Sequence, residues 1–99
     1  MTRKAIVAAL ACAALPAFAQ DSPAARSLAA SCAACHGTDG RSATPELVAL
    51  AGLPREHIAA QMRAFRDGAR PATVMQQIAR GYSDQQIDLM ADYFSRRPR

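Results

Sequence analysis

The stretch Cys32-Ala33-Ala34-Cys35-His36 is the most informative part of this chain, because its spacing is that of a covalent haem attachment site. Two thiols separated by two residues can add across the two vinyl groups of a porphyrin and form thioethers. An imidazole directly after the second thiol can then reach the iron from one face of the ring. We therefore predict one covalently bound haem c, attached through Cys32 and Cys35, with His36 as an axial iron ligand.

Residues 1–19 have the composition of an export signal. A basic start, with Arg3 and Lys4, precedes an apolar run from Ala5 to Leu15, and Ala17-Phe18-Ala19 matches a small-residue cleavage site. The apolar run is too short to span a membrane. We predict a signal peptide over residues 1–19, cleavage after Ala19, and one domain over residues 20–99. The expected location is the periplasm, because thioethers to haem are made outside the cytoplasm, and we expect no transmembrane segment.

Cys12 lies inside this segment and would be removed with it. The alternative is a lipoprotein anchored at Cys12, but Ala9-Leu10-Ala11 is a poor match because the bulky residue is out of place. Cleavage also removes two of the 12 basic residues and none of the eight acidic ones, so the formal charge falls from +4 to +2. This balance gives no sign of a nucleic-acid partner.

The domain has little with which to build a hydrophobic core. Removing 19 of the 99 residues leaves about 80, and small scaffolds usually need a disulfide, a metal or a cofactor. Its aromatic side chains are few, namely Phe65, Tyr82, Tyr93 and Phe94. A large apolar cofactor would supply the missing core, which supports the haem prediction independently of the motif.

The remaining sequence predicts an all-α domain. Ser22-Pro23 is typical of a helix start, and an Ala- and Leu-rich helix should run from about Pro23 to Cys35. Residues 41–53 should form a loop with one helical turn near 46–50, and a helix with an apolar stripe should follow from Pro54 to Gly68. A short helix over about 73–80 and a terminal helix, opened by the capping box at 83–86 and ending near 96, complete the prediction.

Three other interpretations of the cysteine pair fit less well. A thioredoxin-like dithiol requires strands around it, and no segment alternates with strand period. A structural zinc site requires a second ligand pair, and His57 is the one spare His or Cys in the domain. A disulfide between Cys32 and Cys35 would close too small a loop to stabilise the fold.

The sixth iron ligand is harder to find from position alone. The candidates are Met62, Met75, Met90 and His57. Met62 and Met90 lie in apolar helical stripes, where methionine usually fills the core, and His57 lies in the polar first turn of a helix. Met75 follows the Arg70-Pro71 break in the least regular stretch, so position favours it, although it could also belong to a small apolar face.

From Ala29 to Arg97 the chain resembles the class I monohaem cytochromes c of the small bacterial type. The likeness extends to the cytochrome subunit of flavocytochrome c sulfide dehydrogenase and to cytochrome c4- and c553-like domains. Beyond the segment 32–40, the resemblance rests on Leu50-Ala51-Gly52, Phe65-Arg66-Asp67-Gly68-Ala69-Arg70-Pro71, Met75-Gln76-Gln77-Ile78-Ala79-Arg80-Gly81-Tyr82-Ser83-Asp84 and Leu89-Met90-Ala91-Asp92-Tyr93-Phe94. It implies the cytochrome c class I fold, with four to five short helices around one haem, and it implies Met75 as the second axial ligand.

The sequence departs from this family at one position near the haem. Such proteins often have a proline four residues before the glycine of the Leu-Ala-Gly segment, and its carbonyl accepts the Nδ1 proton of the ligating histidine. Here that position is Val48, and the nearest proline is Pro45. Val48 can still offer its carbonyl, but the sequence leaves open which carbonyl orients His36.

These observations predict a one-electron carrier rather than an enzyme. Histidine and methionine would close both axial positions, and the thioether favours Fe(II) and raises the potential. The alternative is a haem enzyme or gas sensor, such as a peroxidase, with an open sixth position and His57 or Arg70 as the distal polar group. The expected partners are redox proteins. One option is a flavoprotein subunit of a sulfide dehydrogenase, and another is a terminal oxidase fed by a free carrier.

Overall fold

The computed structural model describes residues 8, 9, 11, 13 and 21–99. The predicted signal peptide over 1–19, its cleavage site and Cys12 therefore lie outside the described residues, apart from those four isolated positions. Residues 21–99 contain α1 (Pro23–Ala30), α2 (Ala33–His36), the 3₁₀ turn η1 (Thr38–Gly40), α3 (Arg55–Arg66), α4 (Met75–Ala79) and α5 (Asp84–Ser95). No strand occurs in this part of the chain, so the all-α prediction is confirmed.

Both predicted helix starts are confirmed by their capping contacts. The Ser22 hydroxyl accepts a hydrogen bond from the amide of Ala25 at 3.1 Å, and Pro23 occupies the first helical position, where its missing N–H costs nothing. At α5 the Ser83 hydroxyl accepts from the Gln86 amide at 3.2 Å, and the Gln86 side chain accepts from the Ser83 amide at 2.9 Å. This reciprocal box satisfies two N–H groups that lack partners within the helix.

The structure corrects two predicted helical segments. The helix expected from Pro23 to Cys35 ends at Ala30, because the Ser31 hydroxyl donates to the Leu28 carbonyl at 2.7 Å and the Cys32 amide closes a tight turn on Ala29 at 3.0 Å. The helical turn expected near 46–50 is absent. There the amides of residues 50 and 51 both donate to the carbonyl of Gly40, at 2.8 and 3.1 Å, instead of to their own turn.

The core lies where α1, α3 and α5 meet. Helix α5 contributes most of it, and Ile87 and Met90 are 0% and 2% exposed. Tyr93 and Phe94 pack edge to face with ring centroids 5.4 Å apart, in the geometry that aromatic pairs favour. The other members of the cluster are Ala25, Ala29, Ile58, Ala59 and Ala91. The prevalence of alanine confirms that this core is thin.

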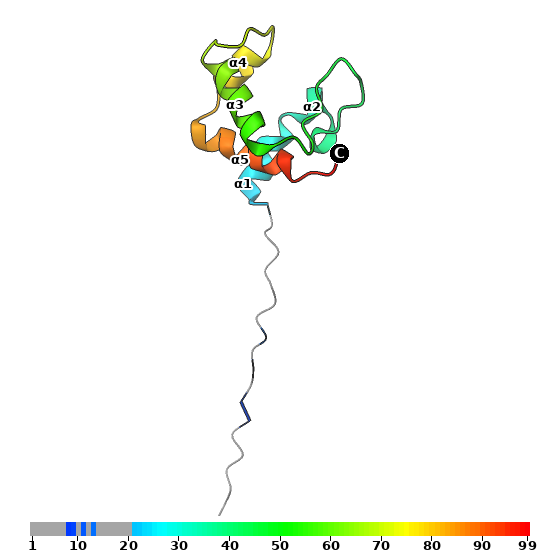
Figure 1. Cartoon of the computed structure of the whole chain (residues 1–99), viewed down its shortest axis with the longest axis vertical. Coiled ribbons are helices and arrows are strands. Elements are labelled where there is room, and N and C mark those ends of the chain that lie inside the picture. Colours follow the sequence, from blue (N-terminus) through cyan, green and yellow to red (C-terminus); the bar gives the residue numbers. More distant parts are fainter. Residues whose placement is uncertain (1–7, 10, 12, 14–20) are drawn as a thin grey trace, which may run out of the picture.

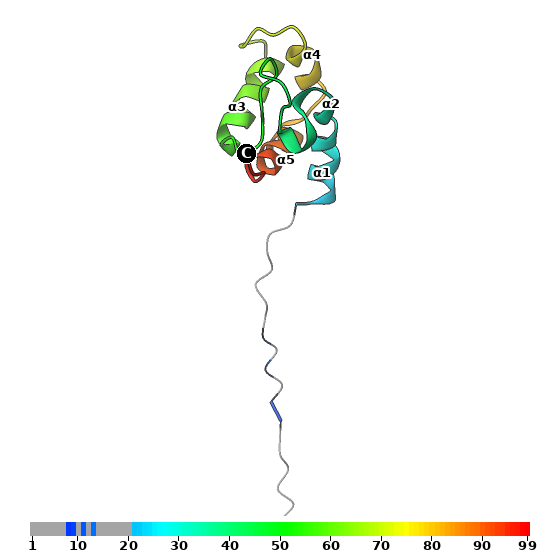
Figure 2. The ribbon, with the colours of Figure 1, turned by 90° about the vertical axis from the view of Figure 1, so that its right-hand side faces the viewer.

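Two groups of elements, which we call arms, extend from this core. Helices α3 and α4 form one arm, and α2 with the 41–49 loop forms the other, above the crossing of α1 and α5 (Figure 1). In the perpendicular view α1 and α2 follow one another up one side of the molecule (Figure 2). The cysteine motif and Met75 therefore come from different arms.

Candidate haem-binding site

Cys32, Cys35 and His36 lie within one helical turn. The amides of Cys35 and His36 both donate to the Cys32 carbonyl, at 3.3 and 2.8 Å, so α2 brings the two sulfurs and the imidazole close together. Both cysteines are free thiols; Cys32 is half-buried and Cys35 is exposed. The pKa of the Cys32 thiol is raised overall. Burial is the main cause and the neighbouring Cys35 adds to it, while the contact with Ser31 acts in the opposite direction.

The orientation of the His36 ring is set by a backbone carbonyl. Its Nδ1 lies 2.7 Å from the carbonyl oxygen of Val48. Because a carbonyl can only accept, Nδ1 carries the proton and the ring's other nitrogen, Nε2, is left as the basic one. Val48 is the position where related proteins often have proline, and the contact needs no proline because it uses the main chain. The question that the sequence left open is thus answered by Val48.

The turn after His36 requires unusual backbone. Gly37 has φ +81° and ψ 166°, a conformation nearly restricted to glycine. A Cβ atom at this position would lie 2.1 Å from the carbonyl oxygen of Arg41. The following turn is held by Asp39, whose carboxylate accepts a 2.6 Å hydrogen bond from the hydroxyl of Tyr93 on α5. That bond is the main reason why the pKa of Tyr93 is raised.

Met75 is the first residue of α4 and differs from the other methionines in its surroundings. It is half-buried and lies outside the core cluster of the described residues. Met90 is in the core, and Met62 packs against it, as predicted for stripe methionines. His57 is exposed on the first turn of α3. Among the three candidate methionines, Met75 is therefore the one that the core does not already use.

The surface around these residues suits a large apolar group. Among residues 21–99, the exposed large hydrophobic side chains are Leu47 (42% exposed), Val48 (62%), Val74 (55%) and Ile78 (39%). They fall in two short segments, one at the carbonyl that orients His36 and the other around Met75. Large apolar side chains that gather at the surface indicate a binding surface, so the described residues fit a haem.

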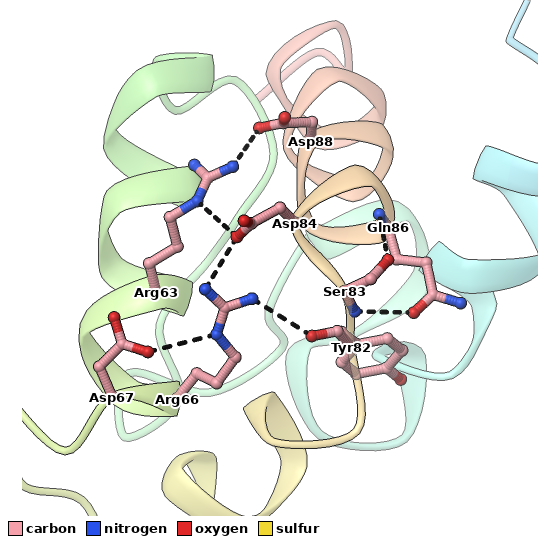
Figure 3. A network of polar contacts seen from close by, with 8 residues as sticks. All are labelled: Arg63, Arg66, Asp67, Tyr82, Ser83, Asp84, Gln86 and Asp88. Carbon is pink, nitrogen blue, oxygen red and sulfur yellow. Dashed lines mark hydrogen bonds and ion pairs between the residues drawn. The ribbon is translucent and has the colours of Figure 1, made fainter.

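The arm that carries Met75 is joined to α5 by an arginine–aspartate network (Figure 3). Arg66 donates to Asp84 at 2.8 Å and Arg63 donates to Asp84 at 3.2 Å, while Arg63 also reaches Asp88 at 2.9 Å. Arg66 is the larger of the two causes that hold the pKa of the Asp84 carboxyl below its ordinary value. Arg66 further donates to the Tyr82 carbonyl at 3.4 Å, just beyond α4.

Sequence reasoning missed the side chains that brace the site from a distance. Tyr93 and Tyr82 were expected only as part of a small aromatic core. Their hydroxyls instead bond Asp39 and Ser31, residues that lie 54 and 51 positions away. No local signal marks such pairs, because their members belong to different elements.

Comparison with known proteins places the chain in a family. Residues 23–96 match the cytochrome c family model. The chain is 42% identical over 67 residues to the cytochrome subunit of sulfide dehydrogenase of Chlorobaculum tepidum, with 68% of this chain and 60% of that protein covered. It is 44% identical over 69 residues to the thiosulfate dehydrogenase electron acceptor of Thiomonas intermedia, covering 69% of this chain and 32% of the relative. It is 38% identical over 77 residues to cytochrome c4 of Pseudomonas aeruginosa, covering 78% of this chain and 38% of the relative.

The chain belongs to the cytochrome c family, and the resemblance stated from its motifs is confirmed. Its cofactor is covalently bound haem c. The chain spans 60%, 32% and 38% of the lengths of these three relatives. Within the described residues, no helix is long and apolar enough to cross a membrane. The same part of the chain contains no group of three or more His, Cys, Asp or Glu side chains that could hold a metal ion.

Proposed function

We propose that this protein is a periplasmic electron carrier whose haem is attached to Cys32 and Cys35 and coordinated by His36 and Met75. The observation that carries the proposal is the 2.7 Å contact between His36 Nδ1 and the Val48 carbonyl. It leaves Nε2 as the nitrogen available to iron and holds the ring still, as carbonyl partners do for metal-ligating histidines. The two free thiols in the same turn complete the attachment site.

Each residue then has one task. Haem c, when bound, supplies reversible one-electron chemistry between the ferrous and ferric states. Cys32 and Cys35 would hold the group in place, and His36 and Met75 would both ligate its iron, which would leave no site for a substrate. The exposed apolar side chains of Leu47, Val48, Val74 and Ile78 would keep water from the group, because they lie beside His36 and Met75 in the chain.

The alternative of a haem enzyme or gas sensor needs a polar group free to act at an open position. Arg70, one of the two candidates for that role, has its guanidinium 4.7 Å from the Phe65 ring centroid and is bonded to Gln61. His57, the other candidate, is exposed at the opposite end of α3 from Arg66. These contacts favour the carrier over the enzyme.

Substitution of the methionines tests the ligand assignment. We expect Met75→Ala to lose the methionine-to-iron charge-transfer band of the ferric protein while it keeps covalent haem on a denaturing gel. Met62→Ala, the matched control, should keep both. A wild-type spectrum that is already high-spin, or a band that survives Met75→Ala, would show that Met75 is not the ligand.

The partner that we propose is a flavoprotein, by analogy with the sulfide dehydrogenase subunit that the chain resembles. The alternatives are a thiosulfate dehydrogenase, by analogy with the second relative, and a terminal oxidase supplied by a free carrier. Co-purification of a flavin-containing protein after gentle lysis would support the first. Recovery of a haem protein with no associated flavin would argue for the free carrier.

The proposed export is tested by the mass of the mature protein. We expect the periplasmic fraction to yield a chain that begins at Gln20, as cleavage after Ala19 predicts. A lipid-modified chain that begins at Cys12 would contradict cleavage after Ala19 and would indicate a membrane-anchored lipoprotein.

A further inference from the structure

The segment that carries Met75 is attached to the rest of the protein at its two ends. At its start, the Arg70 amide donates to the Ala64 carbonyl at 3.1 Å, and the Arg70 guanidinium stacks over Phe65 on α3. At its end, the Tyr82 carbonyl accepts from Arg66 at 3.4 Å (Figure 3). Residues 71–82, which include α4, therefore form a segment attached to α3 at both ends, and we call it the Met75 loop.

A further contact ties the Met75 loop to the cysteine motif. The hydroxyl of Tyr82 lies 3.0 Å from the hydroxyl of Ser31, across 51 positions of sequence. Ser31 has one hydroxyl hydrogen and donates it to the Leu28 carbonyl at 2.7 Å. It follows that Tyr82 is the donor and Ser31 Oγ the acceptor. The same Oγ lies 4.0 Å from the sulfur of Cys32.

We propose that Tyr82 is a positioning residue that keeps the Met75 loop closed. This inference rests on the proposed ligation by Met75. When Cys32 and Met75 are both bound to the haem, the hydrogen bond from Tyr82 to Ser31 also joins the Met75 loop directly to the residue before Cys32. Opening of the loop, which takes the Met75 sulfur away from iron, breaks this bond. In Tyr82→Phe the ring keeps its packing against the core, so the variant loses only the hydroxyl bond of the closed state.

The size of the effect follows from one hydrogen bond. A neutral intramolecular hydrogen bond changes an equilibrium by about fivefold, within a range of roughly two- to twelvefold. An external ligand binds only the open state, so its apparent dissociation constant is inversely proportional to the open fraction. Loss of the Tyr82 hydroxyl should therefore tighten the apparent binding of such a ligand by about fivefold.

The test is an imidazole titration of the ferric holoprotein, followed by loss of the methionine charge-transfer band. We expect Tyr82→Phe and Ser31→Ala each to lower the apparent dissociation constant of imidazole about fivefold. The double variant should fall no further than either single one. The matched control is Tyr93→Phe, which also removes a hydroxyl donor but breaks a bond to Asp39, outside the Met75 loop.

The outcomes separate this proposal from the ligand assignment. An unchanged constant in Tyr82→Phe, beside a wild-type protein with a normal methionine band, overturns the role of Tyr82 alone. An equal decrease in Tyr82→Phe and Tyr93→Phe also overturns it, because general destabilisation would then explain both. A wild-type protein without the band removes the assignment of Met75 first, and this proposal with it.

Discussion

The backbone at Gly37, directly after the proposed iron ligand, offers the sharpest test of how the sequence builds the site. Gly37 has φ +81° and ψ 166°, and a Cβ there would meet the Arg41 carbonyl oxygen at 2.1 Å. Gly68, at the end of α3, has a similar φ of +78° but no atom within 4 Å of an added Cβ. Both positions carry the cost of a positive φ, and Gly37 carries in addition the clash and its extended ψ of 166°.

The expected magnitudes differ accordingly. Gly68→Ala should lower the free energy of unfolding by about 1 kcal/mol, because a left-handed alanine costs about 1–2 kcal/mol and reduced freedom of the unfolded chain returns about 0.4–1 kcal/mol. Gly37→Ala carries a conformational cost of about 1–3 kcal/mol and a further cost of about 1–3 kcal/mol from the clash. The unfolded-state effect is the same in both variants, so Gly37→Ala should be worse by about 2 kcal/mol or more.

Guanidinium unfolding of the holoproteins, followed by far-ultraviolet circular dichroism, measures this difference. The midpoints should shift while the slopes of the transitions stay alike, because both variants expose similar surface. Equal midpoints for the two variants would refute the reasoning, since the Arg41 carbonyl would then have moved aside without cost. The turn after His36 would in that case be adaptable rather than restricted to glycine.

Two further predictions concern the core and the arginine–aspartate network. The side chain of Ile87 is 0% exposed. We expect Ile87→Ala to lower the free energy of unfolding by about 2–5 kcal/mol and Ile87→Val to lower it by about 0.5–1.5 kcal/mol. Chemical denaturation measures both losses, and equal losses would contradict close packing around this side chain. The pKa of Asp84 is lowered from 3.8, chiefly by Arg66, so its stabilising effect is present above about pH 4 and is lost as the pH falls through the lower, folded-state value. The wild type should accordingly be more stable than Asp84→Asn at neutral pH, and denaturation at a series of acidic pH values should show the two converging; a constant difference would contradict the linkage.

Much of the secondary structure could be predicted because its causes are local. The hydroxyls of Ser22 and Ser83 each accept a hydrogen bond from an amide three residues ahead, so a few consecutive residues are enough to predict each helix start. The corrected segments failed for the opposite reason. The amide of Leu50 pairs with the carbonyl of Gly40, and no local pattern records that partner.

The same division holds at the candidate site. The thiol spacing and the adjacent imidazole could be read from the sequence, because they depend on residue identity and short separations; Met75 as second ligand is what the family resemblance implies. The contacts of His36 with Val48 and of Tyr82 with Ser31 span 12 and 51 positions and became visible only in the folded chain. Their physical basis is the packing of separate elements, which sets distances that no periodicity along the chain encodes.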